Sequence, residues 1–256
     1  MSAEVVALAA VSALATGCRH VAVGSSASST GPLVASLSVN ERHRTEQGTR
    51  PRTPEEAWQV LAAGNARFMA DERAHPHQDV HFRHRVAAKQ NPFAIFFGCA
   101  DSRVAAEIIF DQGLGDLFVV RTAGHVVDPS VLGSLEFGVG VLDCPLIVVL
   151  GHDSCGAVSA AEAAVRTGDI PGGFLRDIVE RVTPSVLAAS RGGRTPTIEE
   201  IEREHVERTC DLISERSTLI ADRIRSGALG VVGAQYDLAD GEAKVVRTIG
   251  DLGPVR

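Results

Sequence analysis

Hydrophobic and polar residues follow two patterns along the chain from about residue 53 onward. Short, wholly apolar runs lack the polar alternation of a half-exposed sheet, so they predict strands that are buried on both faces. Segments with apolar residues at helical spacing lie between these runs and predict helices. Strands are expected at Phe93–Gly98, Leu117–Arg121, Leu146–Gly151, Ala228–Tyr236 and Glu242–Ile249, with a turn at Asp240-Gly241 between the last two.

The first predicted helix begins at a capping motif, Thr53-Pro54-Glu55-Glu56, and ends before His75-Pro76-His77. The last predicted helix, Thr197–Ser226, is heavily charged, and we interpret it as a solvated surface helix. Strands that alternate with helices predict an α/β fold, in which helices cover a central, mostly parallel sheet. The helices after the first are expected at His81–Gln90, Val104–Phe110, Pro129–Leu142, Gly156–Arg166, Phe174–Ser190 and Thr197–Ser226.

The N-terminal segment differs in character from the rest of the chain. Its apolar run, Val5–Ala15, is too short to span a bilayer and is followed by Cys18 and a Ser-rich stretch. Three interpretations of residues 1–52 stay open: a disordered extension, an over-long predicted start, or a signal and tether lipidated at Cys18. We interpret residues 53–256 as a single domain. An opening without Lys or Arg argues against a signal peptide, so a cytoplasmic location is expected and lipid-anchored export is the alternative.

Charge and cysteine content narrow the function classes. The net charge is −7 without a basic cluster, which argues against nucleic-acid binding. The five cysteines are odd in number and irregularly spaced, so they do not indicate a disulfide framework. Reduced thiols near histidines instead indicate metal binding or catalysis.

Candidate metal ligands lie just past the ends of two predicted buried strands. Cys99 follows the first strand, and His152 and Cys155 follow the third. Ligands of parallel sheets bind beyond the carboxyl ends of the strands, so these side chains are expected to converge. Two Cys and one His leave one position of tetrahedral zinc free, which is the pattern of a catalytic zinc site.

A carboxylate and a guanidinium follow Cys99 closely. Asp101 is near enough to ligate the metal or to accept a hydrogen bond from a metal-bound hydroxide, and Arg103 can hold it bidentately. Release of Asp101 would close the site, so the pair forms a candidate switch. Taken singly, each residue has an ordinary explanation: a buried Cys, a capping His, a surface ion pair. Their coincidence at two strand ends favours a metal site.

Two motifs carry a family resemblance. Cys99-Ala100-Asp101-Ser102-Arg103 and Gly151-His152-Asp153-Ser154-Cys155-Gly156 resemble the two signatures of β-carbonic anhydrases, and the similarity extends over about Thr53–Gly250, to the actinobacterial branch in particular. It implies the β-carbonic anhydrase fold with an N-terminal helical arm around Trp58 that embraces a partner subunit. The resemblance also implies one Zn²⁺ per subunit, held by Cys99, His152 and Cys155. Asp101 and Arg103 would form the catalytic dyad, and in a closed state Asp101 would be the fourth zinc ligand.

The same resemblance implies substrate-binding residues and an assembly. Gly156, Gln90 and Phe118 match positions that bind carbon dioxide or bicarbonate, the last two across the interface of a homodimer or homotetramer. His125 is a candidate proton shuttle that we interpret rather as structural. The sequence departs from the family pattern at Phe137, which replaces Tyr, and at Phe96, which replaces the Trp of the bicarbonate-inhibited branch. Val104 and Arg121 still match that branch, but Phe96 departs from it, so the resemblance does not predict inhibition by bicarbonate.

The implied reaction is reversible hydration of carbon dioxide to bicarbonate and a proton by attack of zinc-bound hydroxide. Two alternatives stay open. The same site would suit an enzyme that hydrolyses carbonyl sulfide or carbon disulfide. A non-enzymatic zinc-binding module would instead keep Asp101 as a permanent fourth ligand.

Overall fold

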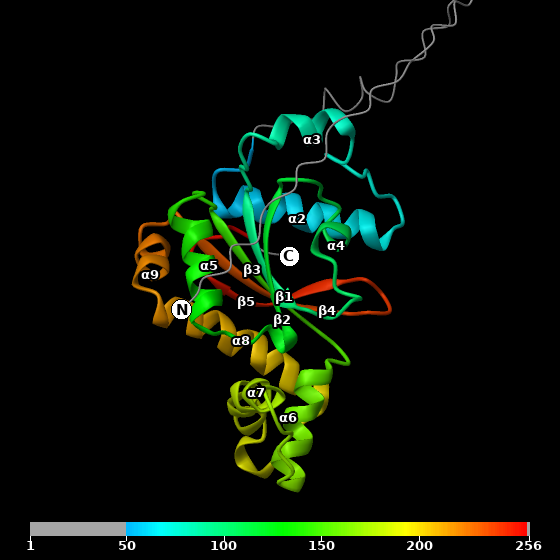
Figure 1. Ribbon diagram of the computed structural model, residues 1–256, viewed down its shortest axis with the longest axis vertical. Helices are drawn as coiled ribbons and strands as arrows, with labels where there is room; N and C mark the ends of the chain where they lie inside the picture. Colours follow the sequence, from blue (N-terminus) through cyan, green and yellow to red (C-terminus); the bar gives the residue numbers. More distant parts are fainter. Residues whose placement is uncertain (1–49, 255–256) are drawn as a thin grey trace, which may run out of the picture. The chain divides into compact units, whose positions relative to one another are not determined.

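The structure, a computed structural model, describes residues 50–254 and is built around one five-stranded sheet (Figure 1). The strand order is β2-β1-β3-β4-β5, and all neighbours pair in parallel except β4 and β5. This confirms the predicted mostly parallel sheet. The strands are β1 (Ala94–Cys99), β2 (Leu117–Thr122), β3 (Leu146–His152), β4 (Gly230–Tyr236) and β5 (Ala243–Ile249).

Helices cover both faces of the sheet, as the apolar runs predicted (Figure 1). One face carries α2 and α4, the other carries α5, α8 and α9, and α6 and α7 pack together beyond the end of the sheet. The α-helices are α2 (Pro54–Met69), α3 (Val80–Val86), α4 (Ala106–Ile109), α5 (Pro129–Gly140), α6 (Gly156–Thr167), α7 (Leu175–Ala189), α8 (Ile198–Arg216) and α9 (Thr218–Arg225), and the 3₁₀ turns are η1 (Ala123–His125) and η2 (Arg191–Gly193).

Alternate residues of the central strands enter two separate cores. In β1, Phe96 packs with Trp58 and Leu61 of α2, while Ile95 and Phe97 pack on the side of α5 and α8. Because successive strand side chains point to opposite faces and both faces are covered, the strand must be apolar throughout. Trp58 is therefore a core residue of its own subunit, and the embrace of a partner by this helix stays a prediction.

The charged helix predicted at Thr197–Ser226 is two helices, α8 and α9. Ser217 breaks the segment with an extended backbone, φ −104° and ψ 110°, and its Oγ accepts a hydrogen bond from the Ile220 N–H. A serine that caps a new helix competes with continuation of the old one. The predicted helix at His81–Gln90 is also shorter in the structure, since α3 begins after the cap Asp79 and ends at Val86.

The interpretation of this charged segment as a solvated surface helix is wrong for α8. Ile201, Val206, Cys210 and Ile213 lie on one face of α8 and are fully buried against the sheet and α6. The acidic residue Glu202 lies on the same face and is also fully buried. The other charged residues of α8 are exposed or only partly buried, so its low overall hydropathy hides an amphipathic pattern.

The N-terminal predictions, including a lipidated Cys18, concern residues that lie outside the described part of the chain. Within residues 50–254, no helix combines the length and apolar character that a membrane span requires. Thr53 does form the predicted capping box with Glu56 at the start of α2.

Burial of Glu202 makes stability depend on pH. Burial raises the pKa of Glu202 to about 8 from an ordinary value of 4.5. Between these values the unfolded chain has released a proton that the folded chain retains, so the free energy of unfolding falls as pH rises. We expect Glu202→Gln to have a higher free energy of unfolding than the parent, measured by urea unfolding of the metal-free protein. This difference should grow by at least about 1 kcal/mol from pH 5 to pH 8. The exposed control Glu215→Gln should show a flat difference, and a flat difference for Glu202→Gln would contradict this account.

Candidate metal centre

Three side chains converge at the carboxyl ends of β1 and β3. Cys99 ends β1, His152 ends β3, and Cys155 is the residue before α6. The strands pair directly, with Gly98 opposite Leu150, so the residues that follow emerge side by side. All three side chains are buried, and their two sulfurs and one imidazole nitrogen lie within 4.8 Å of one another. The structure thus brings together the three residues that the sequence suggested as metal ligands.

The imidazole of His152 has one free nitrogen. Its Nδ1 lies 2.8 Å from the carbonyl oxygen of Asp153, and since a carbonyl only accepts, Nδ1 carries the proton. In the neutral imidazole Nε2 then presents a lone pair, and it is buried without a hydrogen-bond partner in residues 50–254. Buried polar atoms are rarely unpaired, so this orphaned nitrogen beside two thiols fits a bound metal ion.

The two thiols shift each other's pKa in opposite directions. The hydrogen bond from Cys155 is the main cause that lowers the pKa of Cys99, to about 4, and the same hydrogen bond raises the pKa of Cys155. The backbone N–H of Gly124 also donates to the Cys99 sulfur, at 3.3 Å. The surroundings of Cys99 thus favour its thiolate, which is the form that binds a metal ion.

Asp101 stands beside this group, held by Arg103. The guanidinium donates from its Nε to Oδ1 at 2.9 Å and from Nη2 to Oδ2 at 2.8 Å, and the Arg103 backbone N–H donates to Oδ1 at 2.9 Å. These hydrogen bonds hold the pKa of Asp101 well below its usual range. Asp101 Oδ2 is 3.9 Å from His152 Nε2. The carboxylate is ionised and close to the cluster, yet both of its oxygens are engaged by Arg103.

Arg121 of β2 fixes the loop that carries Asp101. Its guanidinium donates to the carbonyl oxygens of Cys99 at 2.9 Å and Asp101 at 2.6 Å. The backbone N–H of Ala100 donates to the carbonyl of Thr122, also on β2. The sequence indicated Arg121 only as a family match; the structure gives it a role in holding the backbone of the first motif.

A second layer of polar residues, which the sequence analysis missed, lies behind the centre. Glu202 of α8 accepts the His152 backbone N–H at 3.0 Å, and His205, one turn on, accompanies it on the buried face. The sequence does contain a signal for the burial of Glu202 and His205, because the apolar residues of α8 form a stripe along the helix that includes both positions. Identifying that stripe would have marked two polar residues as buried and so as functional candidates.

His125 lies in this layer, and its surroundings favour a structural role over that of a proton shuttle. Its side chain is fully buried, with Nδ1 3.7 Å from Glu202 Oε1, and neither ring nitrogen has a hydrogen-bond partner in residues 50–254. Burial lowers the pKa of His125 well below its ordinary value. A proton shuttle must exchange protons with solvent near neutral pH, and a fully buried, neutral imidazole does not suit that role.

Two of the predicted substrate-binding residues lie away from the centre of their own chain. Phe118 pairs with Ile95, four residues before Cys99, which is about 13 Å along a strand. Its ring lies 5.9 Å from that of Phe137. Gln90 lines a separate hollow of about 320 Å³. Their function across a subunit interface stays a prediction.

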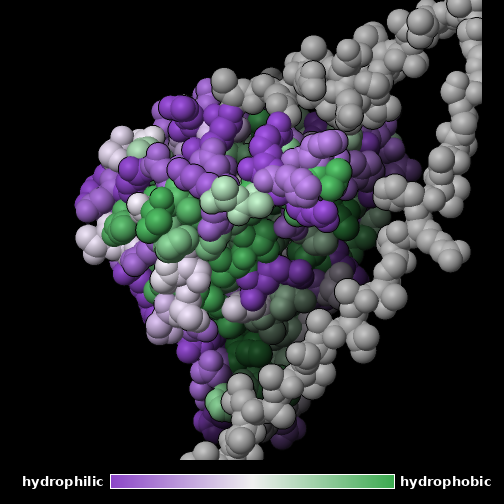
Figure 2. Space-filling model, turned by 45° about the horizontal axis from the view of Figure 1, so that its top comes forward, coloured by the Kyte–Doolittle hydropathy of each residue, from purple (hydrophilic) through white to green (hydrophobic). Residues whose placement is uncertain are grey.

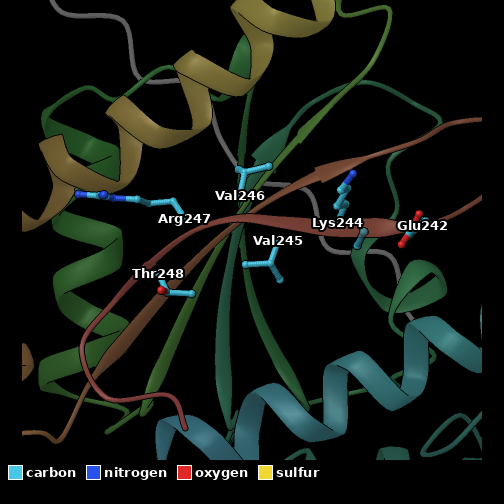
Figure 3. A pocket seen from close by; sticks show the side chains of 7 residues that line it. Glu242, Lys244, Val245, Val246, Arg247 and Thr248 are labelled. Atoms are coloured by element: carbon cyan, nitrogen blue, oxygen red, sulfur yellow. The ribbon is translucent and has the colours of Figure 1, made fainter. Parts of the chain in front are cut away.

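Gly156 does lie at the centre, as the first residue of α6 directly after Cys155. A Cβ placed on Gly156 would meet no atom within 4 Å, so the space beside its backbone is open. Another hollow, of about 530 Å³, is lined wholly by Glu242–Thr248 along β5 (Figure 3). That lining contains no Cys or His, and the hollow is separate from the metal centre.

Comparisons with known proteins identify the family. The family model described as carbonic anhydrase matches residues 94–243, which include both motifs. Carbonic anhydrase 2 of Mycobacterium tuberculosis is 56% identical over 200 residues, covering 78% of this chain and 96% of the relative. The carbonic anhydrase of Mycolicibacterium smegmatis is 53% identical over 202 residues, covering 79% of this chain and 98% of the relative.

Solved structures agree in fold. A β-carbonic anhydrase of Sordaria macrospora, described as tetrameric, has a TM-score of 0.60 at 24% identity and covers 75% of this chain and 98% of its own. The β-carbonic anhydrase CcaA has a TM-score of 0.61 at 20% identity, with 77% and 93% covered. Together with the two motifs and the mycobacterial relatives, these matches confirm the predicted fold and enzyme class: the chain belongs to the β-carbonic anhydrase family.

Proposed function

We propose that the protein binds one zinc ion per subunit through Cys99, His152 and Cys155 and catalyses the reversible hydration of carbon dioxide to bicarbonate and a proton. The observation that supports this most directly is the cluster of three ligand atoms within 4.8 Å, beside an Asp101 that Arg103 engages through both oxygens. Three protein ligands with a fourth held back is the donor arrangement of a catalytic rather than a structural zinc site.

The donor set suits zinc. Thiolate and imidazole are ligands that zinc prefers, and two thiolates balance its charge. When bound, zinc would supply a nucleophilic hydroxide from water near neutral pH. The buried, unpaired Nε2 of His152 and the acidic Cys99 thiol are the features of this chain that prepare it to take the ion.

The remaining residues orient the reactants. Asp101, kept ionised by Arg103, would accept a hydrogen bond from the nucleophile and so orient it toward the carbon of carbon dioxide. The open space at Gly156 lies at the N-terminus of α6, where backbone N–H groups and the helix dipole favour the bicarbonate anion. The proton released in the hydration passes to buffer.

We propose a homodimer or homotetramer as the working assembly, with Gln90 and Phe118 completing the substrate site across the interface. The Sordaria macrospora relatives are tetrameric. Apolar surface is exposed on the molecule (Figure 2), and Val119 of β2, Phe137 of α5 and Val141 directly after α5 are among the exposed hydrophobic residues. Exposed apolar patches of this kind are typical of protein interfaces.

Stopped-flow carbon dioxide hydration across pH, with zinc content measured on the same sample, tests the proposal. We expect hydration that depends on close to one zinc per chain, disappears with a chelator and returns when zinc is restored. A protein that holds one zinc per chain and does not accelerate hydration at any pH would refute the proposed reaction. Carbonyl sulfide and carbon disulfide assays on the same sample would then test the alternative substrates.

Asp101→Asn and Arg103→Ala test the dyad. We expect each to lower the hydration rate by more than about tenfold, because an amide orients the nucleophile poorly and a freed Asp101 can block the site. Zinc should stay bound in both variants, since neither residue is one of the three ligands. Metal analysis checks this division of roles: loss of zinc in either variant would show that the pair helps to hold the metal.

A further inference from the structure

A chain of three hydrogen bonds runs from α7 to the Cys99 sulfur. Ser185 Oγ of α7 lies 2.9 Å from His205 Nδ1 of α8. His205 Nε2 lies 2.9 Å from the carbonyl oxygen of Gly124, and the Gly124 N–H donates to Cys99 Sγ at 3.3 Å. Ser185, Gly124, His205 and Cys99 are all buried, so water does not compete strongly for these groups.

The chemistry of the groups sets the direction of each bond. A carbonyl oxygen only accepts, so His205 Nε2 carries the proton and donates to Gly124. Nδ1 is then the acceptor, and the Ser185 hydroxyl donates to it. Burial lowers the pKa of His205 to about 4, so the imidazole is neutral at working pH and holds this one tautomer.

The turn that presents the Gly124 N–H has an uncommon backbone. Gly124 has φ of 62° and His125 has φ of 39°, so two successive residues lie in the left-handed region. A Cβ at Gly124 would come within 2.6 Å of the Ala157 Cβ. Such conformations persist only where the surroundings impose them. His205 does so by its hydrogen bond to Gly124 and by its ring, whose centroid is 4.4 Å from that of His125.

We propose that His205 is a positioning residue of the zinc centre: it holds the η1 turn so that the Gly124 N–H stays on the sulfur of Cys99, and Ser185 keeps His205 in the tautomer that can do this. An N–H donor withdraws electron density from a thiolate, so it tunes the bond that the sulfur makes to a metal. The inference rests on the zinc-dependent function proposed above and adds a second-layer determinant of it on α7 and α8.

The test compares three variants by zinc affinity and by the sulfur-to-cobalt charge-transfer absorption of the Co²⁺-substituted enzyme. His205→Leu removes the donor, so we expect zinc affinity in chelator competition to fall about tenfold or more and the absorption to move to longer wavelength. His205→Gln retains an N–H near the Nε2 position and should keep affinity within about threefold of the parent. Ser185→Ala should move the absorption in the same direction as His205→Leu, by less.

A merely structural role predicts a different result. Ile213→Ala is the matched control, because Ile213 is buried on the same face of α8, two turns from His205, and its truncation lowers stability without touching the turn. The control should leave the absorption unchanged. If His205→Leu loses stability like Ile213→Ala but keeps the parent's absorption and zinc affinity, the proposal is wrong.

Two further outcomes are decisive. Should His205→Leu not fold, an unchanged absorption and zinc affinity in Ser185→Ala would overturn the proposal. A parent enzyme that binds no zinc would instead refute the proposed function itself, so the two failures are distinguishable.

Discussion

The structure depends on the parallel pairing of β1 with β3. Their register places Gly98 opposite Leu150, so Cys99 and His152 leave the sheet at the same edge, and the short segment to α6 brings Cys155 to the same place. A slip of one residue in either strand would turn its side chains to the opposite face and separate Cys99 from His152 and Cys155. The apolar side chains that fill both faces of the sheet therefore determine the geometry of the metal centre as well as stability.

The charges at the centre explain much of its surroundings. Thiolates and a carboxylate in a buried site are costly unless positive or donor groups face them. Arg103 faces Asp101, Arg121 holds the carbonyls of the loop, and the Gly124 N–H points at Cys99. Each of these donors comes from the first motif, β2 or the turn after β2, so the edge strand of the sheet supports a site whose candidate ligands lie at the ends of β1 and β3.

Local signals in the sequence were sufficient for the sheet, most helices and the metal cluster, because each depends on patterns a few residues long. The two core-facing sides of Phe93–Gly98 and the pair of motifs at strand ends are of this kind. The break at Ser217 was missed because a cap inside a charged helix is weak against the propensity on both sides. Glu202 and His205 were missed because the many charged residues of α8 obscured the apolar stripe that includes both positions. The cross-subunit role of Gln90 and Phe118 stays a prediction.

The central claim is that two thiolates and one imidazole hold a zinc ion that keeps one position for water. X-ray absorption at the zinc edge tests it most directly on the enzyme in solution. The account predicts a four-coordinate ion with two sulfur neighbours at about 2.3 Å and two nitrogen or oxygen neighbours at about 2.0–2.1 Å, one of which exchanges for an added anion. A shell with fewer than two sulfurs, or a fourth ligand that no anion displaces at any pH, would contradict it.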